Sequence, residues 1–205
     1  MVVDLAVEDY LSEAVLKQLI AWSGRKFKVG VRYPVSAAKW KQKHPTGYGE
    51  LKKNILALNK LAEHKPLILL TDLDTAACPS ELISTWLGNC KRQPRFIFRV
   101  AVREIEAWLL ADKDSLANFL SAPVRIIPGN VERLADPKHE IIRIASLSKS
   151  SEIRNGLVPA PKTTARVGPY YNTLLIQFAK HHWNPTDARK NSPSLDKAMN
   201  SIDNM

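Results

Sequence analysis

The chain has 205 residues, of which 45% are hydrophobic, and a formal net charge of +10 at pH 7. This length and apolar content suffice for one packed domain with an extension, or for two small domains, which excludes a wholly disordered chain. No apolar stretch approaches the roughly 20 residues of a membrane helix, and Asp4, Glu8 and Asp9 stand where a signal peptide would carry positive charge. We therefore expect a cytoplasmic protein without a membrane partner.

Strand and helix patterns alternate over the first 112 residues. Apolar and β-branched runs predict strands at 2–8, 27–35, 67–70 and 95–102. Apolar residues at helical spacing, or a proline suited to a first turn, predict helices after each strand, at 11–20, 50–62, from Pro79, and at 104–112. Strands separated by helices favour an α/β fold with a parallel, right-handed sheet of four strands.

The pattern changes after about residue 120. Eight of the thirteen prolines lie in 121–205, and recognisable strands stop there. Helices are expected at 138–149, 170–183 and 194–203, separated by turns that contain proline and serine. We expect an α/β domain over residues 1–120 and a helical extension over 121–205 that packs on it.

Acidic residues stand where the expected strands end. Glu8 follows the first strand, Asp72 and Asp74 follow the third, and Glu106 lies just past the fourth. Because ligands of a parallel α/β sheet bind at the carboxyl ends of its strands, these acids are expected to converge on one site. Gathered carboxylates repel one another, and a hard divalent cation such as Mg²⁺ relieves that repulsion. The pattern predicts a site for a metal ion and a phosphate.

Each acid also has a structural interpretation. Asp72 and Asp74 suit a capping turn, since aspartate often accepts hydrogen bonds from nearby backbone amides. Glu13, at the start of the first helix, is favoured there by the helix dipole whether or not it binds a metal. Of the pair Glu104 and Glu106 only one is needed in the site. We assign Glu106 to it and expect Glu104 to pair with a nearby arginine at the surface.

The excess positive charge belongs to one segment. Residues 14–62 contain eleven Lys or Arg and one acid, whereas the rest of the chain has nineteen of each. Aromatic residues are interleaved with this charge, which suits a surface that binds phosphates and stacks on bases, although a solvated lysine-rich face would look similar. The expected nucleic-acid-binding residues are Arg25, Lys26, Lys28, Lys39, Lys41, Lys43, Lys52 and Lys53.

Two sets of motifs resemble known families. A first strand ending in Glu (LAVEDYLSE) and a third ending in Asp-x-Asp (LILLTDLD) resemble the Toprim domain of topoisomerases, bacterial primases and OLD-family nucleases. AVEDYLSEAVLKQL, LLTDLDTAACPSELISTWL, FRVAVREIEAWLLAD, GPYYN and SPSLDKA are similar to a Toprim-like bacterial family that carries only a domain-of-unknown-function label. The resemblance implies a Toprim-like fold with Glu8 as general acid or base and Asp72 and Asp74 as Mg²⁺ or Mn²⁺ ligands. Glu106 or Glu13 matches a further OLD-type ligand only loosely.

Three functions remain open from the sequence. The first is a Mg²⁺-dependent nuclease or nucleic-acid phosphoesterase of a prokaryotic defence or DNA-maintenance system, working beside a separately encoded ATPase by analogy with OLD proteins. The second is a non-catalytic Toprim-like nucleic-acid-binding or adaptor subunit of such an ATPase. The third is a phosphatase of the haloacid-dehalogenase type, because the segment LILLTDLDT superficially resembles the Asp-x-Asp loop of that family. Toprim proteins usually have Gly after the first glutamate, where this chain has Asp9.

Overall fold

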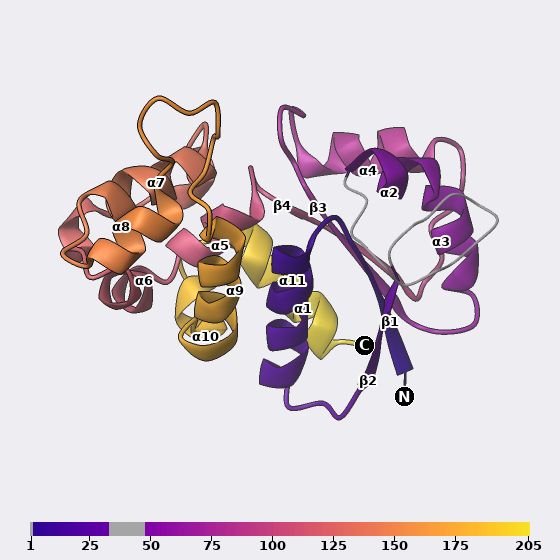
Figure 1. Cartoon of the computed structure of the whole chain (residues 1–205). Coiled ribbons are helices and arrows are strands. Elements are labelled where there is room, and N and C mark those ends of the chain that lie inside the picture. Colours follow the sequence, from indigo (N-terminus) through magenta and orange to yellow (C-terminus); the bar gives the residue numbers. More distant parts are fainter. Residues whose placement is uncertain (1, 33–47) are drawn as a thin grey trace.

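A four-stranded, all-parallel sheet forms the centre of the computed structural model, which describes residues 2–32 and 48–205 (Figure 1). The strands lie in the order β2-β1-β3-β4. They are β1 (Val2–Val7), β2 (Lys28–Arg32), β3 (Leu67–Asp72) and β4 (Phe96–Ala101). Every expected strand is present, so the predicted α/β fold with a parallel sheet and C-terminal helices is confirmed.

Helices cover both faces of the sheet and make up the C-terminal part of the chain. They are α1 (Tyr10–Trp22), α2 (Tyr48–Lys53), α3 (Ile55–Leu61), α4 (Pro79–Leu87), α5 (Ile105–Leu110), α6 (Lys113–Phe119), α7 (Pro137–Ser146), α8 (Ser151–Leu157), α9 (Tyr171–His181), α10 (Pro185–Ala188) and α11 (Pro193–Asp203), with two 3₁₀ turns, η1 (Val124–Ile126) and η2 (Val131–Arg133). The expected helix at 50–62 is divided at Asn54, and the short helices α6, α8 and α10 were not expected. Within residues 2–32 and 48–205, no helix is both long enough and apolar enough to cross a membrane.

Each face of the sheet has its own hydrophobic core. Because side chains alternate along a strand, Leu5 and Val7 enter one core and Ala6 the other. The smaller core holds the apolar residues of α2, α3 and α4, where Trp86 lies against Phe98 with ring centroids 5.4 Å apart. The larger core holds α1 and the helices from α5 onward. Both faces of β1 and β3 are therefore buried, as in parallel sheets generally, whereas the edge strand β2 is partly exposed.

The C-terminal helices share the larger core with the sheet. Helix α9 packs against α1, and α11 packs against β4. Trp108 is fully buried; its Nε1 donates to Ser194 Oγ at 2.8 Å, and its carbonyl accepts from Trp183 Nε1 at 3.2 Å. Figure 1 shows α6 to α10 grouped on one side of the molecule and α2 to α4 on the other, with α1 and α11 between them. The boundary drawn at residue 120 marks a change in sequence pattern, and the larger core continues across it.

Replacing Gly168 by alanine should destabilise the fold. A Cβ at this position would overlap the carbonyl oxygen of Gly156 and lie 2.5 Å from the carbonyl carbon of Leu157. These neighbours are backbone atoms, and Gly168 N donates to Leu157 O at 2.9 Å, so no side chain can rotate away. We expect a loss of roughly 1–3 kcal/mol in the free energy of unfolding, measured by urea denaturation.

The matched control is Gly49→Ala, an exposed position in α2 where a Cβ would meet nothing within 4 Å. This change should leave stability unaltered or slightly raised, because alanine has the higher helix propensity. Equal free energies of unfolding for the two variants would contradict the close contact between Gly168 and α8.

Candidate carboxylate site at the carboxyl edge of the sheet

The four strand-end acids lie at the same edge of the sheet. Glu8 follows β1, Asp72 is the last residue of β3, Asp74 lies two residues later, and Glu106 is the second residue of α5, which begins just after β4. Their exposure rises from the interior outward: Glu106 is 2% exposed, Glu8 and Asp72 are half-buried, and Asp74 is exposed. The four acids thus range from a fully buried to an exposed carboxylate.

Asp72 connects the end of β3 to the start of α5. Its Oδ1 accepts a hydrogen bond from Ile105 N at 2.8 Å, which satisfies one of the unpaired amides at the helix N-terminus. Burial raises the pKa of Asp72 well above its ordinary value, and the neighbouring carboxylates of Glu106 and Glu8 raise it further. Burial and these charges therefore make the ionised form of this side chain less favourable than in water.

Glu8 is tied to the same strand end. Its Oε1 accepts hydrogen bonds from the Thr71 hydroxyl and from Asp72 N, the latter at 3.0 Å. Burial raises the pKa of Glu8, the two hydrogen bonds lower it in part, and the charge of Asp74 raises it again. Because Thr71 and Asp72 belong to β3, these contacts fix the Glu8 carboxylate across the β1–β3 boundary.

Asp74 lies in a turn that is held by the segment after β4. Its φ of 49° is in the left-handed region, which aspartate tolerates better than most residues. Asp74 N donates to Arg103 O at 2.9 Å, and Arg103 Nη1 donates back to Asp74 O at 3.0 Å. The backbone of the Asp-x-Asp turn is thus fixed against the loop that leads into α5.

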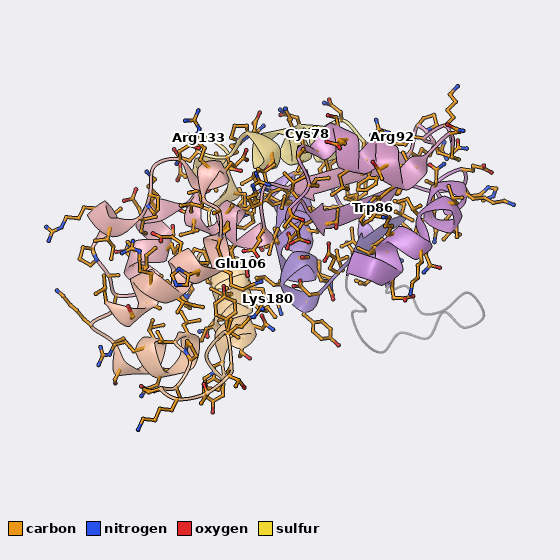
Figure 2. The ribbon with its side chains drawn as sticks, turned by 90° about the horizontal axis from the view of Figure 1, so that it is seen from above. Cys78, Trp86, Arg92, Glu106, Arg133 and Lys180 are labelled. Atoms are coloured by element: carbon orange, nitrogen blue, oxygen red, sulfur yellow. The ribbon has the colours of Figure 1, made fainter. Side chains whose placement is uncertain are left out.

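Glu106 is the most deeply buried of the four acids. Its Oε1 accepts from the Tyr171 hydroxyl at 3.2 Å and lies 3.6 Å from Lys138 Nζ, while its Oε2 is buried and has no hydrogen-bond partner among the described residues. Burial raises the pKa of Glu106 to about 7, with Lys138 lowering it and Glu104 raising it. Figure 2 shows Glu106 near the middle of the molecule, where the sheet meets the C-terminal helices.

Lys138 joins two of the acids. Its Nζ lies 3.6 Å from Glu104 Oε1 as well as from Glu106 Oε1, and its backbone N donates to Glu104 Oε2 at 3.0 Å. Burial alone would lower the pKa of Lys138, but the charges of Glu106, Glu104 and Asp72 together raise it. The partner of Glu104 is therefore this lysine of α7 and not the arginine expected from the sequence.

Three contributors to the site were missed in the sequence. Thr71 lies in the third strand, and Tyr171 belongs to the GPYYN motif, so both stood within segments already singled out. No sequence pattern connected Lys138 with the acids, because it lies 34 positions after Glu104 and outside every motif that was singled out. Only the packing of α7 beside α5 brings it to the acids.

Glu13 has a different environment on α1. Its Oε1 forms an ion pair with Lys17 Nζ at 2.5 Å, one helical turn further along. The residue of this segment that acts on the strand-end acids is Asp9, whose charge raises the pKa of Glu8, Asp72 and Glu106. Asp9 is also the N-cap of α1, with its Oδ1 accepting from Ser12 N at 2.7 Å. This hydrogen bond gives Asp9 a structural role at the start of α1.

Three of the expected nucleic-acid-binding residues lie at the opposite edge of the sheet. Arg25, Lys26 and Lys28 precede or begin β2, and β2 is parallel to β1, so they stand at the amino edge. The five residues of β2 separate them from the carboxyl edge by roughly 16 Å. The guanidinium of Arg25 donates to the carbonyl oxygens of Asp203 and Met205 at the end of α11.

The other expected basic residues follow β2. Lys52 and Lys53 are exposed on α2, and Lys53 Nζ forms an ion pair with Glu50 Oε1 at 2.6 Å. Lys39, Lys41 and Lys43 lie outside the described residues.

The donor set suits a hard divalent cation in its chemistry. All the groups are carboxylate oxygens, the pKa values of Glu8, Asp72 and Glu106 are raised, and Glu106 Oε2 lacks a partner among the described residues. In the described part of the chain, no three His, Cys, Asp or Glu side chains stand close enough together to hold a metal ion as they are oriented. The acids share one edge and one electrostatic environment without forming a closed coordination cage.

A family assignment follows from comparison with known proteins. The model of the family described as "Domain of unknown function (DUF4276)" matches residues 7–148, and the chain belongs to this family. The matched region includes Glu8, Asp72, Asp74, Glu106 and Lys138, but not Tyr171. Comparisons with curated proteins and with solved structures found no match.

Replacing Glu106 by glutamine should reduce the dependence of stability on pH. The folded-state pKa of about 7 lies above the ordinary 4.5, so the folded protein binds more protons than the unfolded chain between these values. The free energy of unfolding therefore falls as pH rises from about 4.5 to about 7, and the Glu106 contribution is up to about 3 kcal/mol. Urea denaturation between pH 5 and pH 8 should show a shallower fall in Glu106→Gln than in wild type.

Glu152→Gln, at an exposed position in α8, is the control and should keep the wild-type pH dependence. If Glu106→Gln has the same pH dependence as wild type, Glu106 does not titrate in this range.

Proposed function

We propose that the protein is a nuclease or nucleic-acid phosphoesterase that depends on Mg²⁺ or Mn²⁺. The observation that carries this proposal is the convergence of Glu8, Asp72 and Asp74 at one edge of a parallel sheet, with the pKa values of the first two raised by burial and by neighbouring carboxylates. A divalent cation would relieve this repulsion and return the carboxylates to their ionised form.

Asp72, Asp74 and Glu106 would hold the cation, and Glu8 would be the general base or a further ligand. When bound, the cation supplies Lewis-acid polarisation of the scissile phosphate. Glu8 would take the proton of the attacking water, a task suited to a carboxylate whose raised pKa increases its proton affinity. Thr71 Oγ1 and Asp72 N hold the Glu8 carboxylate in place for this step.

The resemblance of LAVEDYLSE and LILLTDLD to Toprim domains supports the same function. Toprim domains use their glutamate as general acid or base and their Asp-x-Asp to bind Mg²⁺. OLD-family relatives carry an ATPase domain in the same polypeptide, so we propose a separately encoded ATPase as a partner of this chain. This protein and its ATPase partner would act in a prokaryotic defence or DNA-maintenance system.

A second candidate is a non-catalytic nucleic-acid-binding or adaptor subunit of such an ATPase. It is favoured by the structural roles of two acids: Asp72 caps α5, and Glu106 is bound by Lys138 and Tyr171. A haloacid-dehalogenase-type phosphatase is the weakest candidate, because its Asp-x-Asp motif follows the first strand, whereas Asp72 and Asp74 follow β3.

Asp72→Asn and Glu8→Gln should each abolish metal-dependent cleavage and leave the fold intact. Loss of a ligand charge weakens binding of the cation and its stabilisation of the transition state, and we expect a fall of roughly 100-fold or more in cleavage rate. The fold should persist because the amide oxygen in each variant can still accept the hydrogen bond from Ile105 N or from Asp72 N. A nuclease assay with Mg²⁺ or Mn²⁺ on single- and double-stranded substrates measures the effect.

Glu152→Gln is again the control and should cleave as wild type does. Thermal denaturation of D72N and E8Q should show folded proteins; unfolding of both would assign the acids to structure. If wild type cleaves nothing with either metal, alone or with a candidate ATPase, the adaptor function replaces the nuclease.

Binding of nucleic acid should weaken steeply with salt, and the basic segment after β2 should set the slope. Each phosphate contact on duplex DNA contributes roughly 0.9 to the slope of log affinity against log salt, because counterions are released. Replacing Lys39, Lys41 and Lys43 together by alanine should flatten this slope in filter-binding or anisotropy titrations. The same measurement on Lys113→Ala, in α6, should match wild type. An unchanged slope in the triple variant would assign those charges to solubility.

A further inference from the structure

A cavity of about 790 Å³ lies at the amino edge of the sheet, opposite the carboxylates. Its walls come from the start of β1, from the segment before β3, from the loop before β4 and β4 itself, and from the end of α11 and the residues after it. Figure 2 shows Arg92, from that loop, well apart from Glu106. This amino-edge cavity is therefore a second place on the molecule, distinct from the candidate carboxylate site.

Positive charge dominates the amino-edge cavity. Its charged lining residues are Lys65, Arg92, Arg95 and Arg99, and no Asp or Glu is among the described residues that line it. Within residues 2–32 and 48–205, the one carboxylate within ion-pair distance of these four is Asp4, whose Oδ2 lies 2.7 Å from Lys65 Nζ. In that part of the chain, no Asp or Glu side chain lies within ion-pair distance of the three arginines.

Arg99 is the most buried of the three arginines. It lies on β4 on the same face as Ile97, toward α11, and its Nη2 donates to Ser201 Oγ. Its Nε is buried and has no hydrogen-bond partner among the described residues. Burial and the nearby charge of Arg92 lower the pKa of Arg99. Burying part of a guanidinium beside another cation is unfavourable in free energy, because it loses hydration and meets charge repulsion. An anion between the two guanidinium groups would offset both effects.

The C-terminal end of α11 is bound by Arg25. Helix C-termini carry partial negative charge on their last carbonyl groups. Here the carbonyl oxygens of Asp203 and Met205 accept hydrogen bonds from the Arg25 guanidinium. The side chains that this end of the chain contributes to the cavity include Asn200, Ser201 and Asn204, which are neutral.

The size and lining of the cavity define the ligand class. A volume of about 790 Å³ falls within the range of small-molecule sites and exceeds what an inorganic ion would fill. Arginine forks bind phosphate oxygens in pairs, Asn200 and Ser201 offer neutral hydrogen bonds, and Ile97 adds apolar surface. We propose that the amino-edge cavity binds a phosphate ester of mononucleotide size, with Arg92 and Arg99 on its phosphate group.

Two sources could supply this chemistry: a free nucleotide, or the 5′-phosphorylated end of a nucleic-acid strand. Isothermal titration calorimetry in EDTA would use AMP, a 5′-phosphorylated single-stranded 10-mer, and the same 10-mer with a 5′-hydroxyl. EDTA removes divalent cations, so the measurement does not depend on the carboxylate site or on its proposed nuclease activity.

Wild type should bind AMP, the phosphorylated 10-mer, or both, and the 5′-hydroxyl 10-mer more weakly. Arg99→Gln and Arg92→Gln should each weaken the binding by about tenfold or more, since each loses charged hydrogen bonds to phosphate. Arg92 is exposed, so its variant should fold even if Arg99→Gln does not. Arg133→Gln, an exposed arginine of η2 on the other side of the molecule, is the control and should bind as wild type does (Figure 2).

Binding of AMP assigns the cavity to a free phosphate ester, and binding of the phosphorylated 10-mer alone assigns it to a strand end. Three results would overturn the proposal: no binding of either probe, unchanged binding in Arg92→Gln, or equal affinity for the phosphorylated and hydroxyl 10-mers.

Discussion

The common direction of the four strands determines where the charged groups of this protein lie. In the parallel ladder, Ala6 of β1 pairs with Leu69 of β3, and Leu70 pairs with Arg99 of β4. Segments far apart in the chain therefore end at one edge, which brings Glu8 and Asp72 together although they are 64 positions apart. A reversed strand would have sent one of these acids to the other edge.

Asp72 combines a structural and a chemical role in one side chain. It holds the first amide of α5 and is surrounded by the charges of Glu8, Asp9, Asp74 and Glu106. The hydrogen bond stabilises the helix start, whereas burial and repulsion disfavour the ionised carboxylate. Lys138 offsets part of that repulsion through its ion pair with Glu106. The result is a site in which the pKa values of Glu8, Asp72 and Glu106 are raised and in which added positive charge would be stabilising.

Charge is separated along the strand direction. The segments that follow β1, β3 and β4 carry the acids, and the segments that precede the strands carry Arg25, Lys65, Arg92 and Arg95. Because a parallel sheet places all following loops at one edge and all preceding segments at the other, two regions of opposite sign arise on one small domain. The region of negative charge suits a cation, and the region of positive charge suits a phosphate.

The sequence by itself determined the strands, their alternation with helices, and the acids at the strand ends, because burial on both faces imposes apolar runs of strand length and the turns after them are short. It did not determine which other groups contact those acids. Lys138 and Tyr171 reach Glu106 only because α7 and α9 pack beside α5 and α1, a long-range arrangement with no local pattern. The amino-edge cavity likewise depends on where α11 meets β4, since Arg99 and Ser201 are 102 positions apart. Residue spacing reports periodicity within an element, whereas contacts between elements are decided by tertiary packing.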